Sequence, residues 1–184
     1  MSLKRFYAIT DRKQFVRPFE EQIKRMLDKG IRMFQLREKD LPSKEVFSLA
    51  ERMKSILHGY DALLIINDRV DIALLTGADG VHLPENGVPI SAVKHKFPDL
   101  IVGKSCHSID GALKAEKEGA DYITFSPIFP SPGKGEPVGI DALKEVVSKV
   151  KIPVYALGGI TEEKIKDVLD AGAYGIAGIR IFID

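Results

Sequence analysis

Short apolar segments rich in β-branched residues alternate along this chain with segments of helical periodicity. In the segments between them, apolar residues recur at steps of three and four, as at Phe19, Ile23 and Leu27. Neighbouring parallel strands must be joined by a crossover, so the alternation predicts a parallel α/β fold. The expected strands are residues 6–10, 33–37, 62–67, 80–83, 101–107, 122–126, 154–157 and 175–182.

A weak internal repeat indicates how these strands are arranged. Four pieces share one plan, in which a glycine that ends a helix is followed within a few residues by a strand. They precede the second, fourth, sixth and eighth expected strands, which favours paired βα units repeated four times. This repetition predicts a closed (β/α)₈ TIM barrel, although glycine also ends helices in open, doubly wound sheets. The pieces are GIRMFQLR from Gly30, GADGVHL from Gly77, GADYITF from Gly119 and GAYGIAGI from Gly172.

The chain length limits the loops of such a barrel. Eight strands must share 184 residues, whereas barrels of this kind typically have roughly 250. We therefore expect a single domain over residues 1–184 with short loops. Because the eighth strand reaches the end of the sequence, the barrel is expected to lack its final helix. The outer face of strands eight and one would then be partly exposed or covered by another subunit, so we expect a homo-oligomer.

The charge balance excludes several classes of partner. Lys and Arg number 27 against 26 Asp and Glu, so nothing attracts the whole chain to nucleic acid or to an anionic membrane. Anion binding must therefore come from a few residues that converge on one site. The single cysteine, Cys106, excludes an internal disulfide and a zinc cluster of several cysteines. No signal peptide or membrane span is recognisable, so we expect a cytoplasmic protein.

The segment from Met33 to Lys39 carries the strongest chemical signal. Side chains alternate faces along a strand, so Gln35, Arg37 and Lys39 share one face. If the apolar residues between them pack on the helices, these three point into the carboxyl-terminal mouth of the barrel. Two cations there need a counter-charge, which predicts a bound anion such as a mono- or diphosphate. The alternative is that the strand ends by Arg37 and leaves Lys39 in solvent.

The third expected strand ends on an amide and a carboxylate, Asn67 and Asp68, directly after a buried apolar run. This position places both side chains at the same mouth. Asp68 is a candidate ligand for Mg²⁺, a hard cation that often shares its oxygen ligands with substrate phosphates. The alternative is that Asn67 or Asp68 caps the helix expected over residues 69–76.

A long loop after the sixth strand, residues 126–137, is dense in proline and glycine. It contains Lys134, which suits a lid that brings a cation onto a substrate phosphate. A surface linker with a solvated lysine is the alternative interpretation.

Two glycines, Gly158 and Gly159, follow the seventh strand. Backbone amides without a Cβ can approach a phosphate closely, and TIM barrels often bind phosphate in the loops after strands seven and eight. Arg180, near the end of the eighth strand, would add positive charge there.

Polar residues also end the fifth strand, where Ser105 and His107 share a face. Ser105 is a candidate for hydrogen bonding to a ligand. His82, His107 and Cys106 allow acid–base or nucleophilic chemistry, but their spacing establishes no catalytic triad.

Taken together, the motifs resemble those of thiamine-phosphate synthase and its TenI-like relatives, in the order expected along almost the whole chain. The family is a (β/α)₈ barrel, in agreement with the repeat. The motifs are Tyr7-Ala-Ile-Thr-Asp11, Gln35-Leu-Arg-Glu-Lys39, Ile66-Asn-Asp-Arg-Val-Asp-Ile-Ala73, Gly80-Val-His-Leu83, Ser105-Cys-His-Ser108, Pro127-Ile-Phe-Pro-Ser131 with Lys134, and Gly158-Gly-Ile160.

The resemblance implies a transferase that joins hydroxymethylpyrimidine diphosphate to a thiazole phosphate and releases pyrophosphate. It implies that Asp68 binds Mg²⁺ and that phosphorylated small molecules are the partners. The residues implied to contact the pyrimidine diphosphate are Gln35, Arg37, Lys39, Asn67, Ser105 and Lys134, with Arg37, Lys39, Ser105 and Lys134 assisting catalysis. Those implied around the thiazole phosphate are Ser131, Gly133, Gly158, Gly159, Ile179 and Arg180.

Several departures from the family pattern keep two other functions open. Gly87 stands where the synthase has a second Mg²⁺-binding aspartate, and Glu85 is its candidate substitute. Leu83 and Pro84 look more like the TenI branch, which includes thiazole tautomerases, yet Pro127 stands where the tautomerase has a histidine. A synthase is favoured because the diphosphate-binding set is intact. The alternatives are a TenI-like tautomerase and a non-catalytic protein that binds phosphorylated ligands.

Overall fold

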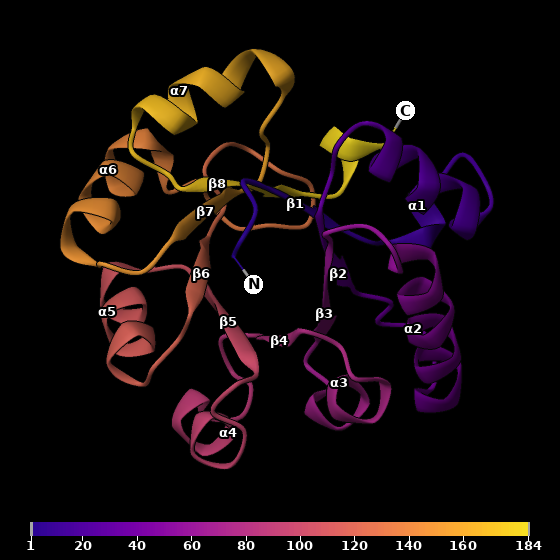
Figure 1. The fold of residues 1–184 in the computed structure, drawn as a ribbon. Helices are drawn as coiled ribbons and strands as arrows, with labels where there is room; N and C mark the ends of the chain where they lie inside the picture. The colour runs from indigo at the N-terminus through magenta and orange to yellow at the C-terminus, as the bar shows by residue number, and fades with distance from the viewer. Residues whose placement is uncertain (1, 184) are drawn as a thin grey trace.

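The computed structural model describes residues 2–183 and shows a closed barrel of eight parallel strands (Figure 1). The strands follow one another around the barrel in chain order, and β1 closes the ring by pairing with β8. The predicted TIM barrel is thereby confirmed. The strands are β1 Phe6–Ile9, β2 Met33–Leu36, β3 Leu63–Asn67, β4 Gly80–Leu83, β5 Ile101–Cys106, β6 Tyr122–Phe125, β7 Val154–Leu157 and β8 Gly175–Gly178.

Seven α-helices lie around the outside of the described barrel and cover its strands (Figure 1). None of the described helices has the length and the apolar stretch that a membrane crossing requires. The α-helices are α1 Phe19–Asp28, α2 Ser43–Leu57, α3 Val70–Thr76, α4 Ile90–Lys96, α5 Ile109–Lys117, α6 Gly139–Lys149 and α7 Ile165–Asp170. Three 3₁₀ helices are η1 Arg12–Gln14, η2 Glu162–Lys164 and η3 Arg180–Phe182.

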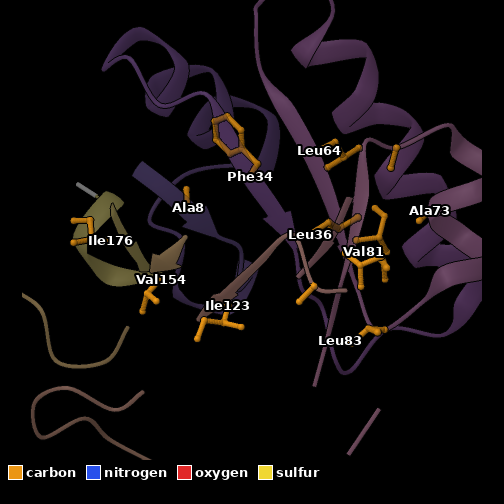
Figure 2. Packing of buried hydrophobic residues seen from close by; sticks show 14 of the residues in the cluster. Ala8, Phe34, Leu36, Leu64, Ala73, Val81, Leu83, Ile123, Val154 and Ile176 are labelled. Atoms are coloured by element: carbon orange, nitrogen blue, oxygen red, sulfur yellow. The ribbon is translucent and has the colours of Figure 1, made fainter. Parts of the chain in front are cut away.

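The main hydrophobic core lies between the strands and the helices. Phe34, Leu36 and Leu64 belong to it, as do residues of β4 and β6–β8 (Figure 2). Helix α1 contributes Ile23 and Leu27, which are fully buried one turn apart on the same face. Because alternate strand residues face this layer, the residues between them must point into the barrel.

Strand β8 differs from the expectation of a strand over residues 175–182. It ends at Gly178, whose ladder partner is Ala8. The chain then turns at Ile179 into η3, which buries Phe182 and brings its ring edge-on to Phe6 at 6.3 Å between centroids. Figure 1 shows η3 beside α1, where an eighth helix would pack, and the described residues contain no α-helix after β8.

The interior of the barrel is filled mainly by tyrosines. Tyr7, Tyr122 and Tyr155 are fully buried, and their rings meet edge-to-face at 5.4–5.6 Å between centroids. Gly103 makes room for Tyr122, since a Cβ at position 103 would lie 2.1 Å from that ring. The Tyr155 hydroxyl donates to the Lys4 carbonyl, so the N-terminal segment closes one end of the barrel. The other end, where the strands terminate, is the mouth.

Candidate active site

Three cations converge on the mouth from two separate segments. Arg37 and Lys39 follow β2, and Lys134 lies in the loop after β6. Although Lys134 reaches solvent, its pKa is lowered by desolvation of the ammonium group and then by the charges of Arg37 and Lys39. None of the three forms an ion pair with any residue between 2 and 183. Repelling cations without carboxylates form a site that an anion would stabilise.

Lys39 departs from the expected strand geometry and follows the alternative, in which the strand ends before it. Strand β2 ends at Leu36, one residue earlier than predicted, and Lys39 is exposed. Its charge nevertheless acts on Lys134, so it lies on the side of the mouth that the loop after β6 approaches. The lid interpretation of this loop stays a prediction.

Another arginine close to the mouth is fully paired. The Arg12 guanidinium donates to Glu38 at 3.0 Å and to Asp40 at 2.6 Å, and it holds the pKa of the Asp40 carboxyl well below its usual range. Glu38 is buried and also accepts from the Thr10 hydroxyl at 2.7 Å. The Thr10 hydroxyl oxygen in turn accepts from the Arg37 amide nitrogen. These carboxylates thus fix the loops after β1 and β2 and leave the Arg37 side chain unpaired.

Asp68 has an unusual backbone conformation at the end of β3. Its φ is +60°, and among residues 2–183 it is the one residue other than glycine with positive φ. Such a conformation costs on the order of 1–3 kcal/mol and is concentrated at functional sites. The alternative capping role of Asn67 or Asp68 is not present, because Arg69 occupies the N-cap of α3 and no side chain caps this helix. The conformation of Asp68 therefore favours a role at the mouth.

The residues at the mouth fit a metal ion only if the ion shares ligands with the substrate. The part of the chain that the structure describes contains no group of three His, Cys, Asp or Glu side chains that could hold a metal. Glu85, the candidate substitute for the missing aspartate, follows β4. Its carboxylate lies 4.0 Å from Nε2 of His107, which follows β5. Asp68 would provide one carboxylate to such an ion, and Mg²⁺ commonly completes a site of this kind with water and substrate phosphates.

His82 is buried in the barrel below the mouth. Burial is the main reason that its pKa falls to about 3, and the charges of Lys104 and Arg37 lower it further. The ring is therefore neutral near pH 7. Its Nε2 lies 2.9 Å from the Ser105 hydroxyl oxygen, and its Nδ1 lies 3.2 Å from the Tyr122 hydroxyl oxygen.

The two tyrosines that continue this contact were missed by the sequence analysis. Tyr7 and Tyr122 hydroxyl oxygens lie 2.8 Å apart, and Gln35 Nε2 donates to the Tyr7 hydroxyl oxygen at 2.8 Å. The period-two alternation that placed Gln35 inside the barrel also applies to Tyr7 and Tyr122, so a signal was present. It was hidden because tyrosine fits an apolar strand without any chemical role.

The other histidine at the mouth has a separate hydrogen-bond partner. His107 Nδ1 lies 2.7 Å from the Ser126 carbonyl oxygen, so this nitrogen carries a proton and donates to it. Its Nε2 faces Glu85. The structure does not place His107 in the buried chain that includes His82.

The glycine pair after β7 has a clear structural reason. Gly158 and Gly159 have φ of +99° and +64°, and a Cβ on Gly159 would lie 2.5 Å from the Pro130 carbonyl oxygen. The start of the loop after β6 packs directly on them, with the Phe129 amide nitrogen donating to the Gly158 carbonyl oxygen at 3.0 Å. No described residue accepts from the amide nitrogens of Gly159 or Ile160, which leaves these donors available to an anion.

The remaining residues proposed for a second phosphate come from the ends of β6 and β8. Ser131 closes a turn by accepting from the Lys134 amide nitrogen at 3.1 Å, and Gly133 within it has φ of +70°. Ile179 is half-buried, and Arg180 is exposed at the start of η3. Arg180 forms no ion pair within residues 2–183. The strand order brings the ends of β6, β7 and β8 next to one another.

The fold defines a TIM-barrel protein, with Arg37, Lys39 and Lys134 on the loops after β2 and β6. The family model described as thiamine monophosphate synthase matches residues 6–182. The chain belongs to this family, as its motifs predicted.

Relatives and solved structures agree with this assignment. The chain is 55% identical to "Putative thiamine-phosphate synthase 2" of Aquifex aeolicus, over all of both chains. It is 39% identical to "Thiamine-phosphate synthase" of Pyrococcus furiosus, over 95% of this chain and 84% of that protein. The solved structure of thiamine phosphate pyrophosphorylase from Pyrococcus furiosus superposes with a TM-score of 0.87, covering 95% of this chain and 85% of that one.

Proposed function

We propose that this protein is a thiamine-phosphate synthase, which joins hydroxymethylpyrimidine diphosphate to a thiazole phosphate and releases pyrophosphate. The observation that carries the proposal is the cluster of unpaired cations Arg37, Lys39 and Lys134 at the mouth. Relatives named thiamine-phosphate synthase, 39–41% identical over nearly the whole chain, support the same reaction.

In the proposed complex, the pyrimidine diphosphate lies between the ends of β2, β3 and β5 and the loop after β6. Arg37, Lys39 and Lys134 bind the diphosphate, where their charges need a counter-charge. Neutral polar groups orient the rest of the substrate; they are Gln35, Asn67 and Ser105.

The chemistry needs no protein nucleophile. The bond between the pyrimidine methylene carbon and the diphosphate oxygen breaks, and the diphosphate leaves with the electron pair. The electron-rich pyrimidine stabilises the resulting carbocation character, and the thiazole nitrogen supplies the pair for the new C–N bond. Arg37, Lys39 and Lys134 stabilise the charge that develops on the leaving group. The absence of a triad from the sequence is consistent with this reaction.

Asp68 is the residue we propose for Mg²⁺, together with oxygens of the substrate diphosphate. The ion would supply further positive charge to the leaving group when it is bound. Because Gly87 offers no carboxylate, we expect metal binding to depend strongly on the substrate.

The thiazole phosphate is proposed to bind on the opposite side of the mouth, after β7 and β8. Within residues 2–183 the amides of Gly159 and Ile160 have no acceptor and Arg180 forms no ion pair, which supports this position. The full set proposed there is Ser131, Gly133, Gly158, Gly159, Ile179 and Arg180.

The test is incubation of the purified protein with both substrates and Mg²⁺, followed by measurement of pyrophosphate and thiamine phosphate. We expect both products in equal amounts from the wild type and a large loss in Asp68→Ala. Tight, Mg²⁺-dependent binding of the diphosphate without any product would refute the synthase and support the non-catalytic protein that Gly87 suggests. Isomerisation of the thiazole carboxylate alone would select the tautomerase.

A further inference from the structure

A chain of buried polar side chains crosses the barrel interior from β2 to β5. It runs from Gln35 through Tyr7, Tyr122 and His82 to Ser105. Successive atoms lie 2.8, 2.8, 3.2 and 2.9 Å apart, and the four residues before Ser105 are at least nine-tenths buried. Both ends of this relay, as we call these five residues, are residues proposed to bind the pyrimidine diphosphate.

One direction of hydrogen-bond donation gives every donor in the relay an acceptor within it. Gln35 Nε2 donates to the Tyr7 hydroxyl oxygen, so the single Tyr7 proton is left for Tyr122. In this direction Tyr122 accepts that proton and gives its own to His82 Nδ1. A neutral imidazole that accepts at Nδ1 carries its proton on Nε2 and donates there to Ser105.

The state of His82 makes this direction possible. Its ring is buried, and the groups within hydrogen-bond distance of its nitrogens are hydroxyls, that of Tyr122 at Nδ1 and that of Ser105 at Nε2. Thr124 Oγ1, at 3.4 Å from Nε2, is the other hydroxyl within reach of that nitrogen. Ser105 is nearer, at 2.9 Å, and is therefore the principal acceptor.

We propose that Tyr7 and Tyr122 are positioning residues for the synthase reaction: through His82 they occupy the acceptor side of the Ser105 hydroxyl, so that its proton points into the mouth. Ser105 then acts as a donor toward an acceptor atom of the pyrimidine diphosphate. This inference rests on the proposed function for the identity of the ligand, but the direction of the relay does not.

A merely structural role for the tyrosines must be distinguished from positioning. Tyr155 provides the matched control, because it is buried in the same cluster, touches Tyr122 edge-on, and donates its hydroxyl to the Lys4 carbonyl outside the relay. Removing the Tyr122 hydroxyl deletes its contacts with Tyr7 and His82, and removing the Tyr155 hydroxyl deletes its contacts with the Lys4 carbonyl and the Met33 sulfur. Only the Tyr122 hydroxyl lies between Tyr7 and His82.

The first experiment compares Tyr122→Phe, Tyr7→Phe and Tyr155→Phe in steady-state kinetics. We expect Tyr122→Phe to lower kcat/KM for the pyrimidine diphosphate about tenfold, the value of one hydrogen bond in the transition state. Tyr7→Phe should lower it less, because Tyr122 can still donate to His82. Tyr155→Phe should stay within about twofold of the wild type. Equal losses in Tyr122→Phe and Tyr155→Phe would overturn the proposal.

The second experiment measures coupling. In a Ser105→Ala background there is no hydroxyl at position 105 for the relay to orient. Adding Tyr122→Phe should therefore lower the activity little further. Fully additive losses would contradict positioning through Ser105.

The third experiment does not depend on turnover. ¹⁵N NMR of histidine-labelled protein should show His82 as the neutral tautomer protonated at Nε2, and Tyr122→Phe should shift this tautomer equilibrium. Protonation at Nδ1 in the wild type would overturn the relay direction even if the protein is an active synthase. The expected tautomer in a protein that forms no thiamine phosphate would uphold the direction and refute the proposed function instead. If Tyr122→Phe fails to fold, the spectra of the wild type and of Tyr7→Phe determine the His82 tautomer instead.

Discussion

Two arginines on neighbouring loops at one end of the barrel, Arg12 and Arg37, have opposite electrostatic environments. Arg12 is paired with the buried Glu38 and with Asp40, whereas Arg37 lies near Lys39 and Lys134 and forms no ion pair with a carboxylate of residues 2–183. The first cluster neutralises itself and holds two loops together. The second cluster, Arg37 with Lys39 and Lys134, would be neutralised by a bound anion. Arg12 has a structural role because two carboxylates pair with it. Arg37 is available to bind an anion because it forms no ion pair within residues 2–183.

The largest effect is expected for Arg37→Ala. Removal of this cation should lower kcat/KM for the pyrimidine diphosphate about 10³-fold, or about 4 kcal/mol of transition-state stabilisation, because charge develops on the leaving group near it. Steady-state kinetics will measure this, with the thermal midpoint as a check of folding. A loss of less than about threefold would contradict the account of the mouth.

Asp68→Ala comes next. Loss of the one carboxylate proposed for the metal should lower product formation about 10²-fold and weaken its dependence on Mg²⁺. The measurement is the rate of pyrophosphate release over a range of Mg²⁺ concentrations, with Asp68→Asn as the neutral, similarly shaped comparison. An unchanged Mg²⁺ dependence would show that the metal is held elsewhere.

Arg12→Ala tests the other cluster. It should lower the free energy of unfolding by about 2 kcal/mol, less than for many buried pairs, because Glu38 keeps its bonds from the Thr10 hydroxyl and the residue 12 amide. Denaturant unfolding will measure this loss. Activity at a temperature where the variant is folded should remain within about twofold of the wild type, and a loss as large as that of Arg37→Ala would remove the distinction between the clusters.

The smallest effect is expected for Lys134→Ala. Lys134 lies in an exposed loop, so its removal should raise the Kd for the diphosphate about tenfold, about 1.4 kcal/mol. Titration at two salt concentrations will check it, since the salt dependence should also weaken. A Kd equal to that of the wild type would support the alternative interpretation, in which the loop is a surface linker with a solvated lysine.

Much of the fold could be predicted from local pattern. The repeated pattern of a glycine followed by a strand predicted the closed barrel, and β4 and β7 have the predicted bounds. The error at β8 could not be seen locally, because residues 179–182 are apolar enough for a strand but the ladder between β1 and β8 ends at the pair Ala8 and Gly178. Burial of Phe182 on the outside of the barrel then favours η3 over extension.

The site was less predictable because pairing is a tertiary property. The alternation in Met33–Lys39 indicates that Arg37 faces the mouth, but no spacing rule shows that Glu38 and Asp40 are taken by Arg12. In the same way, Tyr7 and Tyr122 read as apolar strand residues until the closed barrel places their hydroxyl oxygens 2.8 Å apart.

Calorimetric titration with inorganic pyrophosphate in the presence of Mg²⁺ tests the central claim most directly. The wild type and Arg12→Ala should bind it with similar affinity, while Arg37→Ala should bind it at least tenfold more weakly. Equal affinity in Arg37→Ala and the wild type, or an equal loss in both variants, would contradict the claim that the unpaired cations form the anion site.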